Sequence, residues 1–138
     1  MKEAVAAPAA VRSPKGSESI LLVDDEEGVR KLVGAILRSN GYDVLEAANG
    51  LAALAASEKN SHKIDLLLTD IVMPQMNGFE LGRELAGRSP GLKILYMSGY
   101  RDHPDAGTDV PRPFLHKPFT PDALLGKVRD ALDTEAQP

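Results

Sequence analysis

The chain alternates between short apolar runs and longer segments in which apolar residues recur at helical spacing. The runs are too short for helices and are rich in Ile, Leu and Val, which is typical of strands buried in a parallel sheet. They predict strands over Ser19–Val23, Tyr42–Ala47, a third run that ends at Asp70, Lys93–Met97 and Phe114–His116.

Four segments between and after these runs predict helices. The first spans Glu27–Ser39 and the second Leu51–Lys59, the third begins near the N-cap candidate Asn77, and the last follows Thr120, with Pro121 at its first position. The first helix carries five apolar residues that we expect on its inward face: Val29, Leu32, Val33, Ile36 and Leu37. The alternation predicts an α/β domain with a parallel sheet, right-handed crossovers and helices on both faces.

The pattern also divides the chain into segments. Residues 1–18 are rich in Ala, Pro and Ser without periodicity, so we expect a disordered tail or linker before a domain over 19–133 and a short disordered tail over 134–138. The alternation calls for a further helix over 101–113, but this segment holds three prolines, with only Val110 strongly apolar. It predicts at most a short or irregular fourth helix.

Composition excludes several classes of protein. A length of 138 residues suits one domain, and a net charge of -4 argues against a general nucleic-acid binder. Without cysteine there can be no disulfide and no thiolate metal site, and no apolar run is long enough to span a bilayer. We therefore expect a cytoplasmic protein with no membrane contact.

Polar residues with related chemistry follow four of the predicted strands. Asp24 and Asp25 come after the first, Asp70 ends the third, Ser98 ends the fourth and Lys117 follows the last. Since the site of an open parallel sheet lies beyond the carboxyl ends of its strands, these side chains should converge. Carboxylates, a hydroxyl and an ammonium in one place suggest a divalent cation and a phosphoryl group.

The chain resembles the receiver domains of two-component response regulators over about Ser19 to Leu132. Four motifs in order carry this resemblance: Val23-Asp24-Asp25-Glu26, Asp70-Ile71-Val72-Met73-Pro74-Gln75-Met76-Asn77-Gly78, Met97-Ser98-Gly99 and Lys117-Pro118-Phe119. It implies a doubly wound, flavodoxin-like fold with five parallel strands in the order 2-1-3-4-5. The third and fourth motifs look most like receivers at the C-terminus of hybrid sensor histidine kinases, and a stand-alone regulator remains open.

The resemblance implies a role for each site residue. Asp70 would accept a phosphoryl group from a histidine kinase or phosphotransfer domain, with Lys117 and Ser98 contacting the phosphoryl oxygens. Mg²⁺, with Mn²⁺ as a substitute, would be held by Asp25, Asp70 and the Val72 carbonyl, with Asp24 binding directly or through water.

Further roles follow from the same resemblance. Ser98 and Phe114 would form the conformational switch, and Val72 and Tyr100 would tune the lifetime of the acyl phosphate. The Lys117–Pro118 bond would be cis, and the domain would be a monomer or a weak dimer.

Two functions from other classes stay open at this point. A haloacid-dehalogenase-type phosphohydrolase also uses Asp, Ser or Thr, Lys and Mg²⁺, although its nucleophile follows the first strand and a general-acid aspartate stands where this chain has Val72. A receiver-like interaction module that works without phosphorylation is the other alternative. For the receiver itself we expect no classical turnover, only assistance to its own phosphorylation and slow autodephosphorylation.

Overall fold

A computed structural model describes residues 16–59, 64–99 and 114–134, and it contains one five-stranded sheet. The strands lie in the order β3-β2-β4-β5-β6, and every neighbouring pair is parallel. Counted along the chain this is the order 2-1-3-4-5, so the predicted fold is confirmed. Their bounds are β2 Ser19–Val23, β3 Asp43–Ala47, β4 Leu66–Asp70, β5 Lys93–Ser98 and β6 Phe114–His116.

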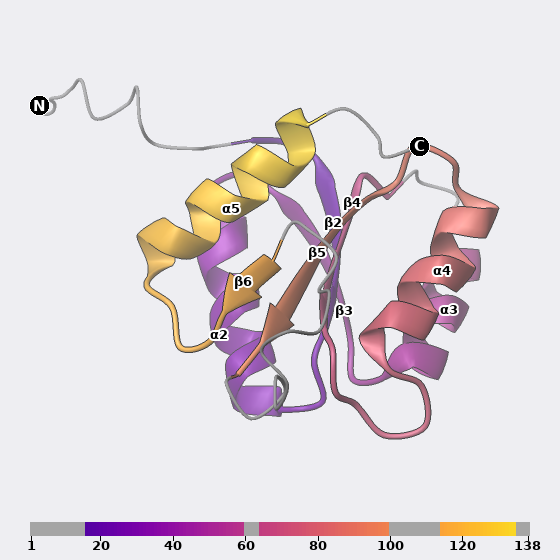
Figure 1. The fold of residues 1–138 in the computed structure, drawn as a ribbon. Helices are drawn as coiled ribbons and strands as arrows, with labels where there is room; N and C mark the ends of the chain where they lie inside the picture. Colours follow the sequence, from indigo (N-terminus) through magenta and orange to yellow (C-terminus); the bar gives the residue numbers. More distant parts are fainter. Residues whose placement is uncertain (1–15, 60–63, 100–113, 135–138) are drawn as a thin grey trace, which may run out of the picture.

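Helices cover both faces of the sheet (Figure 1). α2 (Glu27–Ser39) and α5 (Pro121–Asp133) pack on one face, and α3 (Gly50–Lys59) and α4 (Gly78–Arg88) pack on the other. Alternate residues of β2 serve the two layers, because Ile20 and Leu22 join the first core and Leu21 and Val23 the second. All four are at most 1% exposed, which explains why the strand reads as a continuous apolar run.

Two helices begin at the predicted caps. The Asn77 side chain accepts a hydrogen bond from the Glu80 amide, and the Glu80 carboxylate accepts one from the Asn77 amide, which completes a capping box. Thr120 Oγ1 accepts a hydrogen bond from the Ala123 amide at the start of α5. Asn77 and Thr120, the last residues of their loops, therefore fix where α4 and α5 begin.

One core prediction is wrong. Leu32 is 63% exposed, whereas Val33 and Leu37 of the same helix are buried. Each residue turns an α-helix by about 100°, so Leu32 lies well to one side of the contact line that runs through Val33 and Leu37. The apolar face that the sequence predicts for α2 includes Leu32, whereas the face that packs against the core is narrower and leaves it out.

The domain makes contacts slightly before the boundary expected at Ser19. The Gly16 amide donates to the Asn40 carbonyl, and the Glu18 carbonyl accepts from the Asp43 amide. Glu18 also forms an ion pair with Arg129 of α5 at 2.6 Å. Of the tails expected over 1–18 and 134–138, residues 1–15 and 135–138 lie outside the described residues, as do the irregular helix expected over 101–113 and Tyr100.

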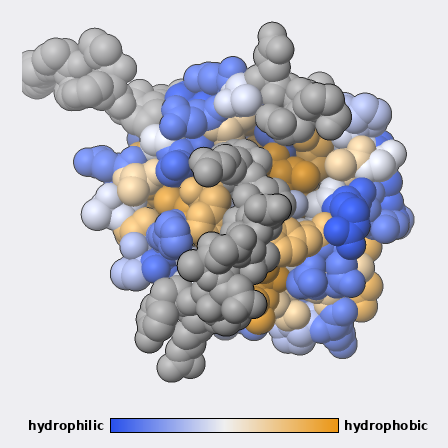
Figure 2. Space-filling view, viewed as in Figure 1, coloured by the Kyte–Doolittle hydropathy of each residue, from blue (hydrophilic) through white to orange (hydrophobic). Residues whose placement is uncertain are grey.

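Hydrophilic and hydrophobic residues are unevenly distributed over the molecular surface. Figure 2 shows hydrophilic residues around much of the rim of the face seen in Figure 1 and hydrophobic residues nearer its centre.

Within the described part of the chain, none of the helices combines the length and apolar character that a membrane crossing requires.

Candidate functional site

The strand register brings the predicted polar residues to one edge of the sheet. Val23 pairs with Thr69, so Asp24 and Asp70 follow at the same level of β2 and β4. Ser98 pairs with His116, which places Lys117 directly beyond the ends of β5 and β6. Residues separated by up to 93 positions therefore meet because parallel strands end together.

Three carboxylates form a compact acidic cluster at this edge. One oxygen from each of Asp24, Asp25 and Asp70 lies within 4.8 Å of the others. Asp24 is fully buried and Asp70 is 5% exposed, whereas Asp25 is exposed. Such a set of hard oxygen donors, open on one side, fits a Mg²⁺ or Ca²⁺ ion that keeps some of its water.

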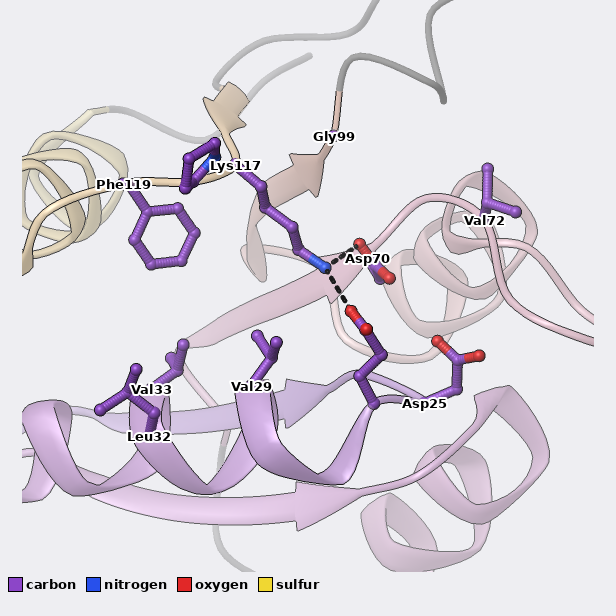
Figure 3. Close-up of a pocket in the computed structure, with 11 residues that line it drawn as sticks. Asp25, Val29, Leu32, Val33, Asp70, Val72, Gly99, Lys117 and Phe119 are labelled. Carbon is purple, nitrogen blue, oxygen red and sulfur yellow. Dashed lines mark ion pairs between the residues drawn. The ribbon is translucent and has the colours of Figure 1, made fainter.

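Lys117 bridges two of these carboxylates, Asp24 and Asp70, and Figure 3 shows its ion pair with Asp70. Its Nζ lies 3.0 Å from Asp70 Oδ1, 3.2 Å from Asp24 Oδ2 and 3.8 Å from Glu26 Oε1. Burial by itself would lower the pKa of Lys117, but its hydrogen bond to Asp70 and the charges of Asp70 and Asp24 outweigh that, so the pKa is raised. The ammonium therefore stays charged and offsets part of the repulsion within the acidic cluster.

The backbone beside Lys117 aims its side chain into the site. The Lys117–Pro118 peptide bond is cis, and the Lys117 amide donates to the Ser98 carbonyl at 2.9 Å. The end of β5 and the residue that supplies the ammonium are thus tied together. Ser98 itself is fully buried, and its hydroxyl donates to the Gly99 carbonyl at 3.0 Å.

Asp24 is held at several of its polar atoms. Its amide donates to the Ala47 carbonyl at 3.2 Å, and its Oδ1 accepts from the Glu26 amide at 2.9 Å. Its carbonyl accepts from Arg30 Nη1 at 2.8 Å, and Lys117 contacts Oδ2. A buried carboxylate needs such partners, because leaving a buried charge unpaired costs several kcal/mol, on the order of 3–5.

The expected switch and lifetime residues have different surroundings. Phe114 is half-buried, and its ring meets that of His116 edge-to-face with the centroids 4.7 Å apart. Val72 lies on the loop after β4 and is 55% exposed at the pocket (Figure 3). The structure thus places Val72 at the mouth of the site, whereas Tyr100 lies outside the described residues.

A cavity of about 710 Å³ opens over the acidic cluster. One side is lined by Asp25, Glu26 and Asp70, and the other is apolar. We call this second side the apolar rim, and it consists of Val29, Leu32, Val33, Pro118 and Phe119.

Sequence reasoning did not assign to the site the three residues that α2 contributes to the apolar rim, Val29, Leu32 and Val33. It also missed two polar residues, Glu26 beside Lys117 and Arg30 behind Asp24. For Glu26 the signal was available, because it is a third acidic residue directly after the Asp24-Asp25 pair.

Comparison with known proteins identifies the relatives of the chain. The profile of the response regulator receiver domain matches residues 20–129. The sensor kinase CckA of Brucella abortus is 37% identical over 97% of this chain, which spans 15% of that protein. The response regulator receiver protein CpdR of the same organism is 34% identical, and the match covers 82% of this chain and 95% of CpdR.

Solved structures agree with the sequence relatives. The receiver domain of the hybrid histidine kinase CckA has a TM-score of 0.71 at 37% identity, with 83% of this chain and 99% of that domain covered. Chemotaxis protein CheY4 of Vibrio cholerae has a TM-score of 0.69 at 29% identity, with 85% and 100% covered. Neither the phosphohydrolase nor the phosphorylation-independent module gains support from these relatives. With its fold, its acidic cluster and these matches, the chain belongs to the response regulator receiver domain family.

Proposed function

We propose that Asp70 accepts a phosphoryl group from a phosphohistidine of a histidine kinase or phosphotransfer domain in the cytoplasm. An oxygen of the Asp70 carboxylate attacks phosphorus, the P–N bond breaks, and the neutral imidazole leaves after taking up a proton. The observation that carries this proposal is the position of Asp70, which lies at a strand end within 3.0 Å of the Lys117 ammonium and inside the acidic cluster.

Mg²⁺ is the cation that we propose for the acidic cluster, with Mn²⁺ as a substitute. Asp25, Asp70 and the Val72 carbonyl would hold it directly, and Asp24 directly or through water. When bound, the ion neutralises negative charge on the phosphoryl oxygens. The donor chemistry supports this assignment, because all three side chains of the cluster are carboxylates.

Lys117 and Ser98 are proposed to donate to the phosphoryl oxygens. The Lys117 ammonium already touches the carboxylate that would react, so little movement separates it from a group bound there. A preorganised donor such as Lys117 stabilises the charge that develops during transfer without reorganising at that moment. The Ser98 hydroxyl donates to the Gly99 carbonyl and would have to turn to reach the phosphoryl group.

Intact-mass spectrometry with a small phosphodonor such as acetyl phosphate tests the proposed function. We expect the protein to gain one phosphoryl group with Mg²⁺ and none with a chelator. Continuous turnover of phosphate esters would instead indicate a phosphohydrolase. A folded protein that binds Mg²⁺ but gains no phosphoryl group would indicate the interaction module.

The apolar rim supports a protein as the phosphoryl donor. The cavity leads to Asp70, so a phosphohistidine that enters it brings the surface of its own domain against the apolar rim. Leu32 and Phe119 are apolar at this place, and Leu32 is 63% exposed. An exposed leucine beside a reactive site is the kind of surface that an apolar helix face of a partner can cover.

Leu32→Asp is therefore expected to slow phosphotransfer from a phosphorylated histidine phosphotransfer domain by about tenfold, which corresponds to about 1.4 kcal/mol. Uptake from acetyl phosphate should change much less, because a small donor does not need the surface that Leu32 offers to a protein partner. Leu51→Asp is the matched control, since Leu51 is 55% exposed but lies on α3, on the other face of the sheet. Equal slowing in both variants would contradict the proposed role of the rim.

Val72 and Tyr100 are proposed to give the acyl phosphate a long lifetime. Val72 is exposed at the mouth of the cavity and offers no hydrogen bond to orient a hydrolytic water. Val72→Asn supplies an amide at this place, so we expect the phosphoryl mass to decay severalfold faster than in the unmodified protein. An unchanged rate of decay would remove Val72 from this role.

We further propose that Ser98 and Phe114 form the switch, in which the bound phosphoryl group favours a state with Ser98 turned toward it and Phe114 turned inward. Phosphate shifts this equilibrium only by its difference in affinity for the two states. Phe114 supports this role by its place, because it is half-buried on the short strand β6, whose neighbour β5 ends at Ser98. A Phe114→Ala protein that is phosphorylated and still changes its partner affinity normally would refute this role.

A further inference from the structure

A polar chain behind the acidic cluster connects it to the edge strand β3. Arg30, one turn into α2, donates from Nη1 to the Asp24 carbonyl at 2.8 Å and from Nε to Glu46 Oε1 at 3.3 Å. The side chains of Arg30 and Glu46 are each only 12% exposed. The Arg30 guanidinium thus links the loop that carries Asp24 and Asp25 to the Glu46 carboxylate on β3.

The bond to the Asp24 carbonyl bears directly on Asp25. That carbonyl belongs to the peptide group that joins Asp24 to Asp25, and a peptide group is planar. Fixing the direction of its oxygen therefore also fixes the direction in which the backbone enters Asp25. Because Asp25 is exposed at the cavity, its backbone is the main means by which the fold can aim its carboxylate.

Glu46 holds the Arg30 side chain in place. Besides Arg30, it binds Arg38 Nη1 at 2.9 Å and Lys31 Nζ at 3.3 Å. Burial by itself would raise the pKa of Glu46, but the hydrogen bonds and charges of Arg38 and Lys31 outweigh that, so the pKa is lowered and Glu46 stays ionised. The planar guanidinium of Arg30 can meet both of its acceptors at once, which a lysine ammonium does less well.

We propose that Arg30 is a positioning residue for the metal ligands and sets the affinity of the acidic cluster for Mg²⁺. The inference rests on the proposed function, since it concerns the same cation. Arg30 acts through the Asp24–Asp25 peptide and not by touching the ion. Groups that orient metal ligands in this way typically change metal affinity by about 10–100-fold when they are removed.

Arg38 provides a matched control. Its side chain also binds Glu46, and it donates from Nη2 to the Val44 carbonyl at 3.1 Å. Both acceptors belong to β3, so Arg38 shares the ionic partner of Arg30 but not its bond to the loop. Arg38→Gln removes the same charge from the same helix and leaves the Asp24 carbonyl bonded.

The test is a Mg²⁺ titration of the full chain followed by amide NMR shifts, with folding verified by circular dichroism. We expect Arg30→Gln to raise the Kd for Mg²⁺ about tenfold, Arg30→Lys about threefold, and Arg38→Gln less than about twofold. Without metal, the Asp25 amide resonance should move in Arg30→Gln and stay in place in Arg38→Gln. This shift reports on the peptide group and would not follow from a general loss of stability.

Two outcomes would overturn the inference. The first is an Arg30→Gln protein that binds Mg²⁺ as the unmodified chain does, and the second is an equal loss of affinity in Arg38→Gln. If Arg30→Gln does not fold, unchanged affinity in Arg30→Lys together with an unmoved Asp25 resonance overturns it as well. An unmodified protein that binds no Mg²⁺ would overturn the proposed function together with this inference, so the two failures are distinguishable.

Discussion

Asp70→Asn is expected to abolish phosphoryl uptake from a small phosphodonor while leaving the protein folded. An amide oxygen is a far weaker nucleophile than a carboxylate, and the substitution also removes one negative charge from the acidic cluster. The shape of the side chain hardly changes, so the packing around the nearly buried position should persist. Intact-mass spectrometry with acetyl phosphate and Mg²⁺ should find no added phosphoryl group.

Asp43→Asn is the control for this experiment. Asp43 is exposed at the start of β3, at the opposite end of the strands from the acidic cluster, so its substitution should leave phosphoryl uptake unchanged. A phosphoryl group gained by Asp70→Asn at the normal rate would show that another residue is the acceptor. Peptide mapping would then have to locate it, and our assignment of Asp70 would be withdrawn.

The fold was largely predictable because the buried strands coincide with apolar runs in the sequence, and polar or turn-forming residues mark where these runs end. β2 and β4 are buried on both faces and read as continuous apolar runs, and polar or turn-forming residues follow each of them. Asn77 and Thr120 cap their helices with local hydrogen bonds, which involve residues only three positions away. Signals that depend on near neighbours can be read without knowledge of the tertiary structure.

The convergence of the acidic residues was predictable for a different reason. Parallel strands end at one edge, so a residue directly after a strand has its location set by topology alone. The partners of each side chain are not set in this way. That Lys117 bridges Asp24 and Asp70, and that Arg30 reaches the Asp24 carbonyl, depends on rotamers and on the exact path of the loops.

Leu32 shows the limit of periodicity. Its spacing from Val29 and Ile36 fits an apolar helix face, yet its side chain is mostly exposed at the rim of the cavity. Periodicity counts apolar residues and does not distinguish those that face the core from those that face a functional surface. The mismatch between pattern and burial is therefore itself informative about the site.

Lys117→Met is expected to destabilise the metal-free protein by about 2–3 kcal/mol, somewhat less than the loss of a fully buried partner. The variant leaves the fully buried Asp24 and the nearly buried Asp70 without the ammonium that now lies within 3.2 Å of both. Chemical denaturation in the presence of a chelator measures this loss. Lys127→Met, an exposed change on α5, is the control and should lower stability by less than about 0.5 kcal/mol.

The pH dependence of this difference follows from the direction of the pKa shift. The pKa of Lys117 is raised in the folded protein above its ordinary value of 10.5, so the stability that its charge contributes is fully present below that value. This contribution is lost as the pH rises through the folded-state pKa. The gap between Lys117→Met and the unmodified protein should therefore be constant from pH 7 to pH 9 and narrow only above about pH 10.5.

Mg²⁺ separates the two roles of Lys117. A divalent cation supplies positive charge to the same carboxylates, so it should stabilise Lys117→Met more than it stabilises the unmodified protein. It cannot supply the donor that Lys117 offers to a phosphoryl oxygen, so uptake from acetyl phosphate should stay slower by on the order of tenfold or more. If Mg²⁺ restored both stability and uptake, Lys117 would serve only to balance charge. If it restored neither, the acidic cluster would not be the binding site for the cation.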